Sequence, residues 1–165
     1  MPMRILGIDP GSVYTGYAVL AIEGNKLLPL ANGRWHLRGS SIGQRLLQLQ
    51  ENLQDLIEVQ RPSVAAVETV FVQKNPNTAI KLGQARGVIL CTLARYALDT
   101  HEYTPATIKQ TLCGNGRADK EQIGWMVGRL LGMRPAPEAD AADAAAVAIC
   151  HHHHAPLRRL KAAQQ

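Results

Sequence analysis

The sequence has few cysteines, few aromatic residues and no long hydrophobic run. Its three cysteines, Cys91, Cys113 and Cys150, lie far apart and form no Cys-x-x-Cys pair, which indicates reduced thiols. No apolar stretch reaches the roughly 20 residues that a membrane-spanning helix needs, and no secretion-signal pattern is present. We therefore expect a cytoplasmic protein with no membrane partner and a core that forms without disulfides.

Acidic residues are also scarce relative to basic ones. The chain has 18 Lys and Arg against 13 Asp and Glu, a formal net charge of +5 over 165 residues. This length suits a single domain. Because a basic surface attracts polyanions, and nucleic acid is the commonest of them, the charge favours a nucleic-acid partner without establishing one.

Hydrophobic patterning predicts strands and helices in a mixed α/β order, beginning with an antiparallel meander of three strands. A Ser-x-x-Gln pattern at Ser41 predicts the start of a helix, and Asn75 followed by Pro76 predicts another. Strands are expected at 4–8, 15–22, 26–37, 64–67 and 101–103, and helices at 42–61, 76–98, 105–112, 119–132 and from 140 onward.

Two of the predicted buried strands end in a carboxylate. Asp9 follows the apolar run that begins at Arg4, and Pro10 keeps it extended, so its side chain should project from the strand end. Glu68 follows Val64 to Val67 in the same way. Taken alone, Asp9 also fits a simple Asp-Pro-Gly turn.

The last predicted helix begins with two aspartates, Asp140 and Asp143, which share a helix face because they are three residues apart. Acids in a first helical turn are favoured by the helix dipole, which offers a purely structural explanation. The alanine-rich body that follows, however, predicts a helix lying tight against the sheet, with these acids facing inward.

These four carboxylates together predict a metal site. Two ionised carboxylates 4 Å apart repel by about 4 kcal/mol at an effective dielectric constant near 20, so a cluster must bind protons or cations. Oxygen ligands without Cys or His select Mg²⁺ or Mn²⁺. Since one or two such ions serve phosphodiester hydrolysis, a basic protein with this site is expected to hydrolyse nucleic acid.

The predicted helix from Pro76 carries a stripe of small residues at four-residue spacing, namely Ala79, Gly83, Gly87 and Cys91. Interior glycines cost about 1 kcal/mol each relative to alanine, which suggests close packing as compensation. That packing can lie within one chain or between two chains in a symmetric dimer.

Several motifs resemble those of the RuvC family of Holliday-junction resolvases, in the family's order, from about residue 4 to 154. They are Gly7-Ile8-Asp9-Pro10-Gly11-Ser12 with Thr15-Gly16, Glu68-Thr69-Val70-Phe71, Leu82-Gly83-Gln84-Ala85-Arg86-Gly87, Lys109-Gln110-Thr111 and Asp140-Ala141-Ala142-Asp143-Ala144. Val13, Thr69 and Leu112-Cys113 depart from the family's usual residues, which concerns substrate contacts more than the reaction.

The resemblance implies a ribonuclease-H-like fold with a mixed five-stranded sheet flanked by helices. It also implies a homodimer that cuts four-way DNA junctions in recombination and repair by paired, metal-dependent nicks, with the RuvAB branch-migration complex as a further partner. By position, Asp9, Glu68, Asp140 and Asp143 would hold one or two Mg²⁺ ions, for which Mn²⁺ can substitute. Lys109 and Lys120 would be positively charged active-site residues near the scissile phosphate or its neighbours. Expected DNA contacts are Phe71, Lys74, Lys81, Arg86 and Arg117, with Phe71 placed against unstacked bases unless it is a core residue.

Two other functions remain open from the sequence: a non-catalytic junction-binding module of the same fold, and an actin-like nucleotide-binding domain. The latter fold uses two such domains, and the chain has no second glycine-rich phosphate loop. We expect a nuclease domain over residues 1–154 and a mobile basic tail over 155–165. The run His151 to His154 lacks the ligand spacing of a structural zinc site.

Overall fold

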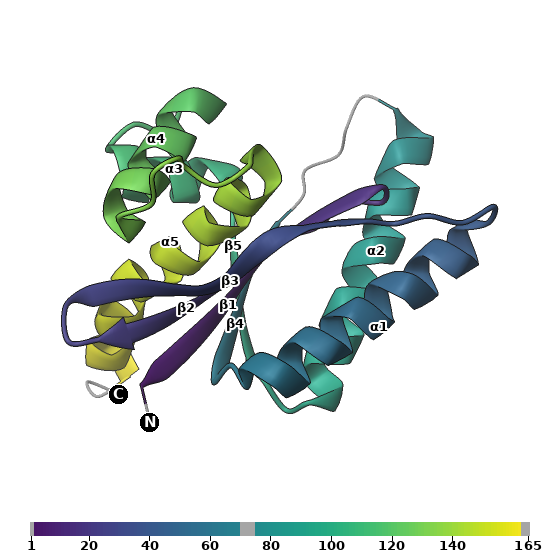
Figure 1. Ribbon diagram of the computed structural model, residues 1–165, viewed down its shortest axis with the longest axis horizontal. Helices are drawn as coiled ribbons and strands as arrows, with labels where there is room; N and C mark the ends of the chain where they lie inside the picture. Colours follow the sequence, from purple (N-terminus) through teal and green to yellow (C-terminus); the bar gives the residue numbers. More distant parts are fainter. Residues whose placement is uncertain (1, 70–74, 163–165) are drawn as a thin grey trace.

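The computed structural model describes residues 2–69 and 75–162 and consists of a five-stranded sheet with helices on both faces (Figure 1). The strands are β1 (Met3–Asp9), β2 (Tyr14–Glu23), β3 (Lys26–His36), β4 (Val64–Glu68) and β5 (Asp99–Tyr103). The helices are α1 (Ile42–Gln60), α2 (Pro76–Arg95), α3 (Pro105–Cys113), α4 (Lys120–Leu131) and α5 (Ala139–Ala162).

The strand order in the sheet is β3-β2-β1-β4-β5. The first three strands form the expected antiparallel meander, whereas β4 pairs in parallel with β1 and β5 in parallel with β4. Because β1 and β4 are parallel neighbours, the residues that end them, Asp9 and Glu68, emerge at the same edge of the sheet. The predicted mixed five-stranded α/β fold is confirmed.

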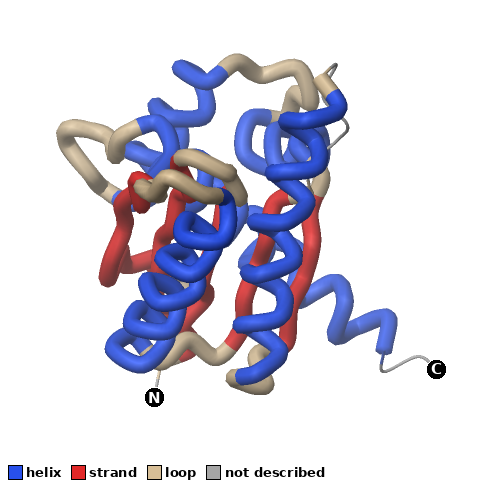
Figure 2. Tube along the Cα trace, turned by 90° about the vertical axis from the view of Figure 1, so that its right-hand side faces the viewer, coloured by secondary structure: helices blue, strands red, loops and turns tan. Residues whose placement is uncertain are grey.

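The two faces of the sheet pack against different helices (Figures 1 and 2). Helices α1 and α2 cover one face and pack on Leu6 and Ile8 of β1. Helices α3, α4 and α5 cover the other face, where Ile5 of β1 joins their core. Since strand side chains alternate between faces, Gly7 and Asp9 lie on the same face as Ile5, beneath α5.

Helix α5 lies close enough to the sheet that its backbone nearly touches two strand glycines. A Cβ atom on Gly7 would lie 2.1 Å from the carbonyl oxygen of Ala144, and one on Gly16 would lie 2.0 Å from that of Asp140. Any residue other than glycine at these two positions would push α5 away from the sheet. The expectation that the alanine-rich helix packs tightly on the sheet is therefore confirmed, and this contact sets the height of Asp140 and Asp143 above β1.

The predicted helix starts agree with the observed caps, and some ends differ. The side chain of Ser41 accepts a hydrogen bond from the amide of Gln44, and Asn75 caps α2 with Pro76 in its first turn. Helix α2 ends at Arg95 rather than Leu98, because the backbone of Ala97 adopts a positive φ of 53°.

The last helix extends further than the sequence suggested. Helix α5 continues to Ala162, so residues 155–162 have a helical backbone, and its last turns run outward toward the C-terminus (Figure 2). The division into a domain ending at 154 and a tail stays a prediction. Within the described ranges, no helix combines the length and apolar character needed to cross a membrane.

The α5 contact yields a stability prediction. Gly7→Ala should lower the free energy of unfolding by about 1 to 3 kcal/mol, because the new methyl group meets backbone atoms of α5 that cannot rotate away. Gly124→Ala in α4 is the matched control, since a Cβ there meets nothing within 4 Å and should stabilise the helix slightly. Urea unfolding of both variants tests this, and an unchanged midpoint for Gly7→Ala would contradict the assigned packing.

Candidate active site

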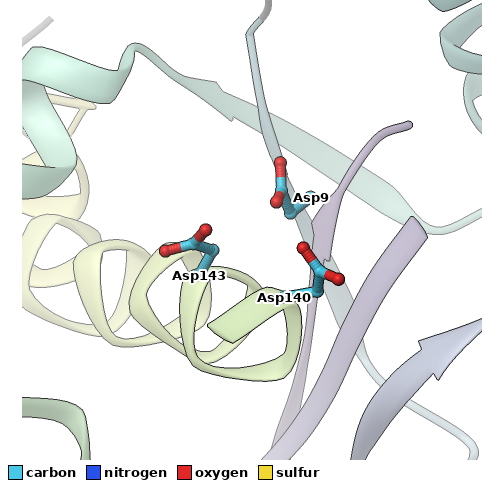
Figure 3. A group of neighbouring side chains, drawn as sticks. All are labelled: Asp9, Asp140 and Asp143. Atoms are coloured by element: carbon cyan, nitrogen blue, oxygen red, sulfur yellow. The ribbon is translucent and has the colours of Figure 1, made fainter. Parts of the chain in front are cut away.

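Three aspartates from opposite ends of the chain meet at the edge of the sheet. Asp9 ends β1, and Asp140 and Asp143 lie in the first two turns of α5, facing it (Figure 3). Each offers a carboxylate oxygen, and these three oxygens lie within 4.8 Å of one another. In the described part of the chain this is the one group of three or more acidic, His or Cys side chains close enough to share a metal ion.

The turn after β1 holds Asp9 at the strand end. The backbone amide of Gly11 donates to the hydroxyl of Thr15 (3.2 Å), and that hydroxyl donates to the carbonyl of Gly11 (2.9 Å). Thr15 is fully buried, so both bonds are shielded from water. A Cβ at Gly11 would lie 1.8 Å from the carbonyl oxygen of Tyr14, so the turn requires glycine there.

Glu68 lies beside Asp9, on the neighbouring parallel strand β4. The side chains of Asp9 and Glu68 share a hydrogen bond, which requires a proton on one of the two carboxyl groups. Glu68 does not belong to the group whose oxygens all lie within 4.8 Å of one another. The structure therefore brings the four predicted acids together as a close trio with Glu68 adjoining it.

Burial and nearby negative charges raise the pKa of Asp9, Glu68 and Asp143. Burial raises the pKa of Asp9 to about 9, with further contributions from the hydrogen bond to Glu68 and from the charges of Glu68, Asp143 and Asp140. Burial also raises the pKa of Glu68 and of Asp143 above their ordinary values. Two full negative charges 4.8 Å apart would repel by about 3 kcal/mol at a dielectric constant near 20, so the trio must hold protons or a cation.

Two lysines partly offset this charge. The ammonium group of Lys120, at the start of α4, lies 3.5 Å from a carboxylate oxygen of Asp143, and that carboxylate raises the pKa of Lys120. Lys109 of α3 lines a small cavity of about 30 Å³ together with Glu68 and Asp143. Both lysines predicted for the site thus lie at the acidic group.

Arg34 of β3 also belongs to this site, and the sequence analysis did not identify it. Its guanidinium group lies 3.2 Å from Asp140 and 3.6 Å from Glu138. Gly16 pairs with Asp9 on one side and with Arg34 on the other, so the three residues form a row across the sheet beneath the start of α5. Only the β2–β3 register places Arg34 there, and no local sequence pattern reveals it.

The predicted DNA contacts are dispersed. Lys81 is exposed on α2, Arg117 is exposed in the loop before α4, and Arg86 forms an ion pair with Glu102 of β5. Phe71 and Lys74 lie outside the described residues. These roles stay predictions.

Two residues of the histidine run have structural partners away from the acidic group. The Nδ1 atom of the buried His151 lies 2.9 Å from the hydroxyl of Tyr103. The Nε2 atom of His154 shares a hydrogen bond of 3.0 Å with the hydroxyl of Thr111. These contacts tie α5 to β5 and α3. The run does not form a metal-binding group of three within the described residues.

The raised pKa of Asp9 predicts how stability depends on pH. Between the ordinary pKa of 3.8 and about 9, the folded protein keeps a proton that the unfolded chain releases, so the free energy of unfolding falls as pH rises. Without divalent ions, Asp9→Asn should therefore raise the melting temperature more at pH 8 than at pH 5, by about 2 to 4 °C for each kcal/mol regained. Thermal unfolding at pH 5 and pH 8 measures the two melting-temperature shifts. Glu51→Gln, at an exposed position of α1, is the control. An equal shift at the two pH values would contradict this prediction.

Comparisons with known proteins agree with this geometry. Residues 5–151 match the family model described as "Crossover junction endodeoxyribonuclease RuvC". The chain is 48% identical over 156 residues to the RuvC protein of Bordetella parapertussis, covering 94% of this chain and 86% of that protein. It is 46% identical over 151 residues to that of Francisella tularensis subsp. novicida, covering 92% and 88%.

Solved structures agree with these sequence comparisons. Thermus thermophilus RuvC in complex with a Holliday junction substrate superposes with a TM-score of 0.88 at 30% identity, over 94% of this chain and 96% of that one. Another Thermus thermophilus RuvC structure gives a TM-score of 0.86 at 31% identity, with the same coverage. The trio of acids, the mixed sheet and these similarities lead to one assignment: the chain belongs to the RuvC family of crossover junction endodeoxyribonucleases.

Proposed function

We propose that this protein resolves four-way DNA junctions by divalent-metal-dependent hydrolysis of phosphodiester bonds, in homologous recombination and DNA repair. The observation that supports this best is the meeting of Asp9 with Asp140 and Asp143, which lie more than 130 positions further along the chain, next to two lysines. Membership of a family of junction endonucleases supports the choice of substrate.

The donor atoms favour Mg²⁺, with Mn²⁺ as a substitute. All candidate ligands are carboxylate oxygens, which suit hard ions. Asp9, Asp140 and Asp143 would hold the first ion, and Glu68 would join them or help to hold a second. A bound divalent ion would supply Lewis acidity to the phosphate and lower the pKa of an attacking water molecule. The proton shared by Asp9 and Glu68 must leave when these carboxylates bind a cation, so ion binding should release protons.

The chain's own residues would position the substrate and balance its charge. Lys120 lies beside Asp143, on the open side of the trio, with a side chain that is 78% exposed. Lys109 of α3 lines a small cavity together with Asp143, and its charge acts to lower the pKa of that carboxyl group. Both ammonium groups can therefore approach a phosphate that enters the site, and both would stabilise the negative charge that develops during cleavage. Arg34, which pairs with Asp140, would keep that carboxylate oriented toward Asp9 and Asp143.

The acidic trio also favours an enzyme over a non-catalytic junction-binding module. A module that only bound DNA would gain nothing from three half-buried, clustered carboxylates, because they repel phosphate and one another. The repulsion among these carboxylates is offset where a cation binds between them and takes part in hydrolysis.

We propose further that the protein acts as a homodimer through the exposed face of α2. Within the described residues, a Cβ on Gly83 or Gly87 would meet nothing within 4 Å, so packing inside one chain does not explain this stripe. Cys91 is exposed beside it and Ile80 is 60% exposed. A second copy packed on this face would compensate for the helix glycines and bury the isoleucine, and two related active sites could then cut two related strands.

The first functional prediction concerns cleavage. Asp9→Asn should retain binding to a synthetic four-way junction and lose at least about 100-fold in cleavage rate in Mg²⁺, because losing even a residue that merely supports a metal ligand costs 10- to 100-fold. Glu51→Gln, an exposed acid on α1 away from the trio, is the matched control and should cut normally. Gel assays of junction, flap and duplex substrates measure this. Full cleavage by Asp9→Asn would remove this residue from the mechanism.

The second functional prediction concerns the dimer. Gly87→Lys should convert the dimer to a monomer that folds at least as stably, because lysine favours a helix more than glycine does by about 1 kcal/mol and the site is open within the chain. Gly124→Lys in α4, also open, should leave the dimer intact. Sedimentation equilibrium distinguishes these outcomes, and a dimeric Gly87→Lys would place the interface elsewhere.

A further inference from the structure

A groove at the end of α4 combines an exposed aromatic ring with two arginines. It has a volume of about 360 Å³ and lies between the second half of α4 and the segment that leads to α5. Its lining includes Trp125, Arg129, Met133, Arg134 and Pro135. Trp125 is 60% exposed, which is unusual for so large an apolar side chain.

The groove is built by close backbone packing. Gly128 forms part of its lining, and a Cβ on this residue would lie 3.0 Å from the Cβ of Ala136 and 3.3 Å from the carbonyl oxygen of Met133. The segment 133–136 therefore rests directly on α4. This contact holds Arg134 across from Arg129 on one concave surface.

The groove is positively charged and lacks internal neutralisation. Its lining contains no Asp or Glu, and among residues 2–69 and 75–162 neither Arg129 nor Arg134 has an ion-pair partner within 4.0 Å. The guanidinium group of Arg129 lies 5.3 Å from the centre of the Trp125 ring, a cation–π arrangement that holds both side chains in place. An aromatic surface flanked by two unneutralised guanidinium groups fits a ligand with a flat ring and adjoining negative charges.

The groove lies on the same helix as one of the active-site lysines. Helix α4 begins at Lys120, whose ammonium group contacts Asp143, and Arg129 is nine residues further along. Nine residues span roughly 13 Å along the axis and about two and a half turns, so Arg129 projects from the side of α4 opposite Lys120. A strand that joins the active site to the groove must therefore pass around α4 over several nucleotides.

We propose that this groove binds an unpaired nucleotide of the DNA substrate, several nucleotides from the cut, with its base stacked on Trp125 and its flanking phosphates on Arg129 and Arg134. This assignment rests on the proposed function for its substrate, and it adds a subsite to that substrate. Unpaired DNA is favoured over duplex because an indole ring can stack only on a base whose face is free.

Tryptophan fluorescence tests this directly. The chain has two tryptophans, Trp35 and Trp125, so Trp35→Phe leaves Trp125 as the sole reporter, and Asp9→Asn prevents cleavage. Oligothymidylate and an open four-way junction should quench the emission and protect it from iodide. A duplex whose two ends are closed by non-nucleotide linkers, and which therefore has no unpaired base, should not. Equal quenching by this closed duplex would overturn the preference for unpaired bases, and no quenching by any DNA would overturn the site.

Binding measurements supply an independent readout. Trp125→Ala should weaken oligothymidylate binding about tenfold. Arg129→Met and Arg134→Met should each reduce the slope of log K against log salt by about 0.7. Arg95→Met is the control for nonspecific charge, because Arg95 ends α2 on the other face of the sheet. It should reduce the salt slope less than Arg129→Met or Arg134→Met does. Quenching that depends on protein concentration without DNA would show that a second copy covers the groove, and would overturn the proposal.

The two proposals fail separately. If Asp9-dependent junction cleavage is observed but Trp125 does not respond to DNA, only the groove assignment is wrong. If Trp125 responds to oligothymidylate but junctions are not cut, the groove remains a nucleotide site and the proposed resolvase activity is wrong.

Discussion

The contact on which the structure most depends is the close approach of helix α5 to strands β1 and β2. Gly7 and Gly16 have no side chains to separate the helix from the sheet, and the facing backbone of α5 at Asp140 and Ala144 lies within about 2 Å of where their Cβ atoms would be. Alanines along α5 extend this contact into the core, where Ala144, Ala145 and Ala148 are fully buried. The helix is consequently held at a fixed height and rotation over the end of β1.

This packing determines the chemistry of the site. The first two turns of α5 lie over the row formed by Asp9, Gly16 and Arg34, so Asp140 meets Asp9 on one side and Arg34 on the other. Burial at this site raises the pKa of Asp9 to about 9. The same arrangement that costs stability without a cation provides a set of oxygens that a divalent ion can bind. Stability and function therefore oppose each other at this edge of the sheet.

Six basic residues of β3, α3, α4 and the loops beside them form two groups, according to whether they lie at the acidic site. Lys109, Lys120 and Arg34 lie against the carboxylates and balance part of their charge. Arg117, Arg129 and Arg134 have no acidic partner within the described ranges, which leaves their charge available to a polyanion.

The sequence by itself determined the element order, the α/β class and the candidate acids, because strands, helix caps and alternating burial are encoded by residues close together along the chain. Asp9 and Glu68 could be identified as strand ends, and the alanine content of α5 predicted its tight packing. Only the tertiary structure decided that Asp9, Asp140 and Asp143 form the close trio with Glu68 beside it, and that Arg34 joins them. It also showed that Gly83 and Gly87 face outward and that Trp125 lies beside two arginines. These features depend on strand register and on the rotation of packed helices, which are set by contacts between distant segments and leave no local pattern in the sequence.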